Sequence, residues 1–238
     1  MKFVFIFFLQ LAIIGVSYSQ NHHVYGLFPT LNLKKKLNPK VEIETYSFLS
    51  IHPMEQVIEG NLYPSRTSVF YTEFDVTYLL NNKWSFTGSY TYERVNPFEE
   101  SYRNENRFWV QTTFKQKFER FNLKNRLRYD LRFIKNRATS STEFNPRIRY
   151  LIGFDFPFNK DKNSLYLASY NEFFFNTYSN SIAVFGENWF SSSIGFSLSK
   201  QVKMEGGYLN ISWIKDEQKN WLIQHYLQVT LIINLIKV

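Results

Sequence analysis

Residues 122–134 alternate, almost without error, between two incompatible kinds of side chain. Leu127 and Leu131 share one parity, whereas Arg126 and Arg128 share the other. A period of two along the chain indicates a β-strand with one apolar face and one charged face. The fold therefore depends on which of these two faces meets water.

The same alternation recurs along most of the chain and predicts an all-β protein. Turn and loop signals rich in Asn, Gly and Pro separate the alternating segments. A Gly206–Gly207 pair inside one of the later segments predicts a bulge or bend. The predicted strands span residues 25–33, 41–50, 69–80, 83–95, 107–119, 122–134, 147–158, 165–175, 189–199, 203–214 and 221–236.

Short connections alternate with long ones. The short turns fall at residues 34–40, 81–82, 119–122, 159–163 and 199–203, and the longer loops at residues 52–66, 96–103, 135–145, 176–187 and 215–220. Outer-membrane β-barrels place short turns on the periplasmic side and long loops outside the cell. The connection lengths favour this class of protein.

The apolar parity is rich in aromatic residues, since the chain has 25 Phe and 16 Tyr against 9 Gly and 7 Pro. Facing Arg126, Arg128 and Arg132 toward lipid would cost about 2–4 kcal/mol for each residue at the bilayer midplane. That total is comparable with the roughly 5–15 kcal/mol that keeps a domain folded. We therefore expect lipid on the aromatic face and charge in the lumen, which is an antiparallel up-and-down transmembrane β-barrel of about 10–12 strands.

The predicted strand number conflicts with a general rule. Eleven segments are predicted, whereas single-chain bacterial barrels have an even number of strands. Either residues 25–33 lie outside the barrel, which leaves ten strands, or one further strand is hidden, which gives twelve.

The first residues predict export. Met1-Lys2 precedes an apolar block at residues 3–16 and the small residues Ser17 and Ser19, a pattern typical of a secretory signal peptide cleaved after Ser19. The block is shorter than the roughly 18 apolar residues of a membrane-spanning helix. Residues 20–238 would then form one barrel domain in the outer membrane, with membrane lipid and the barrel assembly machinery as partners. There is no cysteine for a disulfide.

The net charge is +8 and the pI about 9.4. Such values raise nucleic acid as a partner, but export and the confinement of Arg to one strand face argue against it.

Buried charges need partners of opposite sign, and simple registers put Arg149 opposite Glu172, Asp130 beside Arg149, and Glu93 near Arg107. The predicted lumenal charge ladder consists of Glu93, Arg107, Lys115, Arg126, Arg128, Asp130, Arg132, Arg147, Arg149, Asp155 and Glu172.

This ladder has two interpretations. Barrels of eight strands have room only for side chains, whereas those of sixteen or more enclose an open channel. A barrel of ten to twelve strands lined with Arg and Lys is thus expected to be narrow or occluded. In the first interpretation the ladder is therefore structural. The functional alternative is a small pore that favours anions.

Four strings of residues resemble a known family: residues 105–111 (ENRFWVQ), 125–132 (NRLRYDLR), 147–150 (RIRY) and 170–172 (YNE). They are similar to the family catalogued as domain of unknown function 2490, whose members are exported bacterial proteins taken to be outer-membrane β-barrels. The resemblance covers most of the mature chain. It implies the barrel and its location but no established activity and no catalytic residues. The chain departs from many outer-membrane barrels in ending Ile236-Lys237-Val238 instead of on an aromatic residue.

Two other classes of protein remain open. A lipid-modifying hydrolase needs a nucleophile beside a base, and among four His only His225 lies where it could reach the outer-leaflet interface, with no serine to pair from sequence. A soluble periplasmic ligand-binding barrel is the second alternative. The residues show no metal-ligand spacing and no glycine-rich phosphate loop, so we expect no metal, no cofactor and no enzymatic activity.

Overall fold

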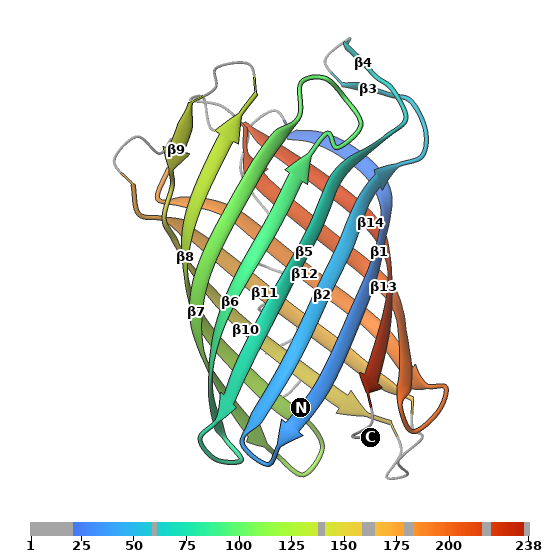
Figure 1. Ribbon diagram of the computed structural model, residues 1–238. Helices are drawn as coiled ribbons and strands as arrows, with labels where there is room; N and C mark the ends of the chain where they lie inside the picture. Colours follow the sequence, from blue (N-terminus) through green and yellow to red (C-terminus); the bar gives the residue numbers. More distant parts are fainter. Residues whose placement is uncertain are drawn as a thin grey trace.

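Strands with one apolar and one charged face close on themselves into a barrel (Figure 1). The computed structural model describes residues 21–58, 61–137, 141–158, 165–178, 183–215 and 220–235. The expected signal peptide (1–19), the turn at 159–163 and the chain end at 236–238 lie outside these residues. The strands are β1 (Asn21–Asn38), β2 (Val41–His52), β3 (Gln56–Ile58), β4 (Asn61–Tyr63), β5 (Arg66–Leu79), β6 (Trp84–Val95), β7 (Arg103–Lys117), β8 (Asn122–Asn136), β9 (Thr142–Phe144), β10 (Arg147–Pro157), β11 (Tyr166–Asn176), β12 (Phe185–Ser197), β13 (Val202–Ile214) and β14 (Trp221–Leu235).

Within the described residues, eleven strands close the barrel, and its seam is a parallel pair. All other neighbours in the ring are antiparallel, whereas β1 and β14 run side by side in the same direction, from Asn21↔Trp221 to Lys35↔Leu235. An up-and-down chain with an odd number of strands begins and ends in the same direction, so its first and last strands can only meet in parallel. The choice between ten and twelve strands was therefore wrong: β1 belongs to the barrel, and parallel closure accommodates the eleventh strand.

Short and long connections gather at opposite ends of the barrel (Figure 1). At the end with the short connections, Asn side chains stabilise two of the turns. Asn38 Oδ1 accepts hydrogen bonds from the backbone N–H groups of Lys40 and Val41. Asn81 Oδ1 accepts them from the backbone N–H groups of Lys83 and Trp84. At the long end, two predicted loops contain small strands. The hairpin β3–β4 lies within the first, and β9 in another extends the edge of β8.

The outer wall of the barrel is apolar and exposed. Along β7, for example, Val110 is 62% exposed while Arg107 on the other parity is 2% exposed. The exposed apolar residues on the outer parity include Leu27, Leu31, Phe74, Val76, Phe86, Tyr90, Phe108, Val110, Leu127, Tyr129, Ile148, Tyr150, Ile194, Phe196, Leu227 and Val229. The predicted division between the two parities is therefore confirmed, with the charged parity enclosed.

Of the bulge or bend predicted at Gly206–Gly207, the bulge is wrong. Both residues continue a regular ladder with β12 and with β14. A Cβ on Gly207 would lie 2.2 Å from the Ser192 carbonyl oxygen and 2.4 Å from the Ser193 Cα, whereas a Cβ on Gly206 would meet nothing within 4 Å. Gly207 thus allows close approach of two backbones instead of a break in the strand.

In the described part of the chain, no helix is long and apolar enough to cross a membrane.

Candidate functional site

Three neighbouring strands place two arginines on one carboxylate. Arg149 on β10 donates from Nε to Glu172 Oε1 at 2.7 Å and from Nη2 to Glu172 Oε2 at 2.9 Å. Arg126 on β8 reaches the same Oε1 at 2.5 Å, past the intervening β10. Bidentate Arg–carboxylate pairs are among the strongest and most directional side-chain hydrogen bonds. Glu172 therefore joins three strands from the inside.

Asp130 on β8 is the centre of a second group. Its side chain is fully enclosed, and its Oδ2 lies 2.8 Å from Arg147 Nε, 3.7 Å from Arg149 Nη1 and 3.9 Å from Arg107 Nη1. Arg147 also reaches Glu187 of β12 at 3.1 Å. One carboxylate thus faces guanidinium groups from two neighbouring strands, which satisfies the requirement that a buried charge be paired.

Glu105 on β7 holds a third group nearer the long-loop end. Arg132 donates to both of its oxygens, each at 2.8 Å, and Arg107 Nε donates to Oε1 at 2.7 Å. Arg107 also lies 3.2 Å from Glu93 of β6. The three groups share arginines, so they form one connected network along the lumenal face of β6 to β12.

We refer to this network, with the adjoining pair Arg128–Glu73 at 3.5 Å, as the arginine cluster. Its cations are Arg107, Arg126, Arg128, Arg132, Arg147 and Arg149, and its anions are Glu73, Glu93, Glu105, Asp130, Glu172 and Glu187. With six members of each sign, the formal charges of the cluster cancel. The excess positive charge of the chain therefore lies elsewhere.

The structure brings the residues of the predicted ladder together except Lys115 and Asp155. The predicted register that put Arg149 directly opposite Glu172 was wrong, since Arg149 is opposite Phe174 and the pair forms on the diagonal.

Lys115 and Asp155 lie on the lumenal parity nearer the short-turn end, where both are exposed. Lys115 pairs in register with Lys124, which carries the same charge. They belong to the mouth of the barrel and not to the arginine cluster.

Three anions of the cluster were missed by the sequence analysis. Glu105 lies two residues before the predicted start of its strand, and Glu187 was placed in a loop, because polar residues continue the alternation of β7 and β12 beyond the apolar segments. Glu73 lies within the strand predicted at residues 69–80, but its partner Arg128 is on β8, three strands away in the ring. No short-range signal reports such a contact across the lumen.

An aromatic layer inside the lumen packs against the arginine cluster. Its members are Phe28, Phe48, Tyr71, Phe174 and Trp189. The Phe48 and Trp189 rings, from β2 and β12 on distant parts of the ring of strands, have centroids 6.3 Å apart. Arg147 and Arg149 lie over the Phe174 ring at 4.8 and 4.5 Å, a favourable arrangement for a cation above an aromatic face. Layer and cluster together obstruct the middle of the barrel.

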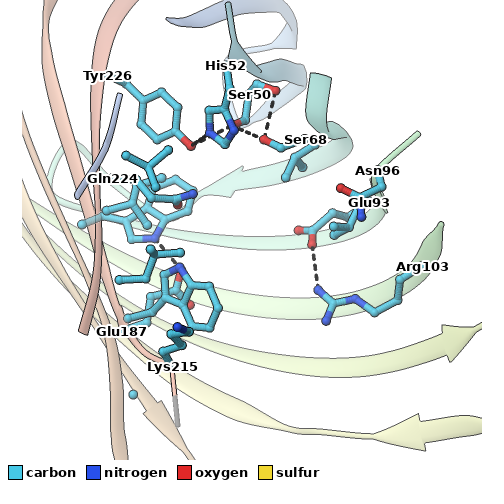
Figure 2. Close-up of a pocket in the computed structure, with 18 of the residues that line it drawn as sticks. Ser50, His52, Ser68, Glu93, Asn96, Arg103, Glu187, Lys215, Gln224 and Tyr226 are labelled. Atoms are coloured by element: carbon cyan, nitrogen blue, oxygen red, sulfur yellow. Dashed lines mark hydrogen bonds and ion pairs between the residues drawn. The ribbon is translucent and has the colours of Figure 1, made fainter. Parts of the chain in front are cut away.

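Above this obstruction, at the long-loop end, the lumen widens into a cavity of about 620 Å³, which we call the vestibule. Figure 2 shows Glu93 and Arg103 on one side of it and Gln224 and Tyr226 on the other. A hydrogen-bonded chain lines the second side: Tyr226 Oη lies 2.8 Å from Ser50 Oγ and 3.2 Å from His52 Nε2, and Ser50 Oγ lies 2.7 Å from Ser68 Oγ. The vestibule thus has Glu93 and Arg103 on one side and aromatic and hydroxyl groups on the other, where Glu187 and Lys215 also lie.

His225 lies on the outer wall beside the β1–β14 seam. Its Nε2 is 2.9 Å from His23 Nδ1, and its Nδ1 is 2.6 Å from Tyr208 Oη. The nearby Ser212 hydroxyl donates to Asn210 Oδ1 at 2.8 Å. The ring nitrogens of His225 therefore face an imidazole and a phenol, which is not the serine–base contact that nucleophilic catalysis requires.

Among the described residues, no three His, Asp or Glu side chains are grouped so as to hold a metal ion.

Fold and interior together define a closed β-barrel with an apolar outer wall, an ion-paired lumen and a vestibule at one end. A family model described as protein of unknown function (DUF2490) matches residues 26–222. The chain belongs to this family, as the sequence resemblance indicated. A search of curated proteins found no match.

Proposed function

We propose that the chain is an integral outer-membrane β-barrel. The single observation that carries this proposal is the exposure of apolar side chains around the wall while arginines and carboxylates are enclosed. In water, an outer wall of Phe, Leu, Val and Tyr is unfavourable by roughly 25 cal/mol for each Å² of apolar surface. In a bilayer the same wall is in its preferred solvent, and closure of the barrel leaves no unpaired strand edge in the hydrocarbon.

The proposed orientation follows from the connections. Outer-membrane barrels have short periplasmic turns and longer extracellular loops. The end with the Asn38 and Asn81 turns would therefore face the periplasm. The vestibule, β9 and the β3–β4 hairpin would face the outside of the cell.

The lumen of this barrel would be a narrow path that favours small anions and carries little current. The contact between Phe48 and Trp189 supports the low conductance. The arginine cluster is balanced in charge, so the preference for anions would come from cationic residues at the mouths, such as Lys115 and Lys124 at the short-turn end.

Fractionation tests the proposal. After carbonate extraction of cells that express the chain, the protein should remain with the outer membrane and should migrate faster on gels when it is not boiled. Recovery in the aqueous fraction would contradict membrane insertion and favour a soluble ligand-binding barrel. Planar-bilayer recordings then test the lumen: small steps with anion preference support the narrow path, whereas large steps or cation preference contradict it.

A further inference from the structure

The vestibule has the size and the partial enclosure of a small-molecule site. Its volume of about 620 Å³ falls within the range of roughly 300–1,000 Å³ that is typical of ligand pockets. The long-loop ends of the barrel strands surround it. Tyr63 at the end of β4 and the following Pro64 contribute to its lining, as do Arg107 and Phe28 deeper in the barrel. It opens toward the long-loop end and not through the apolar wall, so a solute in water would be the natural occupant.

Two arginines of the vestibule have unused hydrogen-bonding capacity. In the part of the chain that the structure describes, the Nε atoms of Arg66 and Arg103 are buried and have no hydrogen-bond partner. Each arginine has one carboxylate partner through an Nη atom: Arg66 donates to Glu99 at 3.3 Å, and Arg103 meets Glu93 only at 4.0 Å. Arg107 holds the other oxygen of Glu93 at 3.2 Å. A buried donor left without an acceptor is unfavourable, and more so when the group is charged. An anionic acceptor in the vestibule would remove that cost.

The other side of the vestibule suits an apolar group. Trp189, Trp213 and Ile211 line it, together with the Tyr226 ring that stacks against His52 at 6.0 Å between centroids. Aromatic side chains bury large apolar areas and pack face to face or edge to face against planar rings. The hydroxyl of Tyr226 and the Ser50–Ser68 pair supply polar contacts on the same side.

We propose that the vestibule binds a small amphipathic organic anion. Its carboxylate or phosphate would accept hydrogen bonds from Arg66 and Arg103, and its ring-sized apolar part would pack against Trp189, Trp213 and Tyr226. Binding would need neither an open lumen nor ion flow, so it goes beyond the proposed function and can be measured without it.

The test uses the purified full-length protein folded in detergent, with phenyl phosphate as the probe and tryptophan fluorescence and calorimetry as readouts. Two further compounds are measured separately. Inorganic phosphate lacks the aromatic ring, and benzyltrimethylammonium keeps the ring but carries a positive charge. Phenyl phosphate should bind at least ten-fold more tightly than either. Equal binding of the cation, or no binding of phenyl phosphate at millimolar concentration, would overturn the proposal.

Variants locate the site. Arg66→Gln and Arg103→Gln should each weaken phenyl phosphate binding about ten-fold, while Lys83→Gln, an exposed turn residue at the opposite end, should leave it unchanged. Each variant is first shown to keep the gel mobility of the folded barrel, so a loss of binding is separated from a loss of folding. If both arginine variants bind as the unaltered protein does, the proposed site is wrong. Retained binding by a protein that fractionates as soluble would support the vestibule and contradict the membrane proposal.

Discussion

Arg149 and Glu172 lie on the diagonal of two adjacent strands and form two hydrogen bonds, at 2.7 and 2.9 Å, inside the barrel. Arg126 adds a third contact to the same carboxylate from one strand further away. Both Arg149 and Glu172 are almost completely enclosed. This carboxylate therefore holds together two cations that would otherwise repel each other in a region with little water.

Glu172→Gln should strongly destabilise the barrel. The neutral amide cannot balance Arg149 and Arg126, and removing one partner of a buried ion pair typically costs about 3–5 kcal/mol. The free energy of unfolding can be measured by urea titration of the protein folded into lipid vesicles. Glu119→Gln, which removes an exposed carboxylate from a turn, is the control and should change stability by less than about 0.5 kcal/mol. A similar small change for Glu172→Gln would contradict a stabilising role for this pair.

The sequence predicted that Arg149 and Glu172 interact but placed them directly opposite each other, and that register is displaced by two residues: Arg149 is opposite Phe174, and Glu172 is opposite Leu151. The two long side chains still meet, because diagonal neighbours on adjacent strands are within reach of each other. The same reasoning placed Glu93 near Arg107 and Asp130 near Arg149, which the structure has at 3.2 and 3.7 Å. Alternation also assigned Arg126, Arg128 and Arg132 to the enclosed face. Local information was sufficient for parity and for which strands are neighbours, but not for their register.

Contacts across the lumen, between strands that are not neighbours, could not be predicted in this way. Glu73 meets Arg128, and Phe48 meets Trp189, only because the closed barrel brings distant strands to face each other. The stagger and the number of strands decide which residues meet, and neither can be read from one strand. The parallel seam is the clearest example, since no turn connects β1 to β14.

The seam can be tested with cysteines, because the chain has none of its own. Leu27 and Leu227 are paired in register and both are exposed on the outer wall. Adjacent strands lie about 4.8 Å apart, which suits the roughly 4.4–6.8 Å between the Cα atoms of a disulfide. The double variant Leu27→Cys with Leu227→Cys should therefore form an intramolecular disulfide on mild oxidation, seen as a shift in gel mobility that a reducing agent reverses.

The control for the seam pairs Leu27→Cys with Leu231→Cys, which is out of register by four residues, or about 13 Å. It should not form the bond. A ten-strand barrel that closes between β2 and β14 would show no disulfide in either double variant, and that result would rule out the parallel closure.

Gly207→Ala and Gly206→Ala form a matched pair on one strand. The added methyl at Gly207 would overlap the backbone of Ser192 and Ser193, whereas that at Gly206 points into open space. Overpacking typically costs about 1–3 kcal/mol, so Gly207→Ala should lower the free energy of unfolding in vesicles by that amount while Gly206→Ala should not lower it. Equal effects at the two positions would contradict the close approach of β12 and β13.

Trp189→Ala tests whether the aromatic layer limits flow through the lumen. Loss of this ring removes the contact with Phe48 across the barrel and should raise single-channel conductance several-fold in planar bilayers. Trp84→Ala removes an aromatic ring from the outer wall, where it packs against Phe114, and should leave conductance unchanged. If both variants conduct as the unaltered protein does, the aromatic layer is not the constriction.

The central claim is that hydrocarbon surrounds the apolar wall. A nitroxide label on Val110→Cys, at a position 62% exposed on β7, measures this directly in protein reconstituted into lipid vesicles, with a label on Lys83→Cys as the aqueous reference. The account predicts that the label at residue 110 collides more with oxygen, which concentrates in lipid, than with a water-soluble nickel complex, and that the label at residue 83 shows the reverse. Equal access of the nickel complex to both labels would contradict the account.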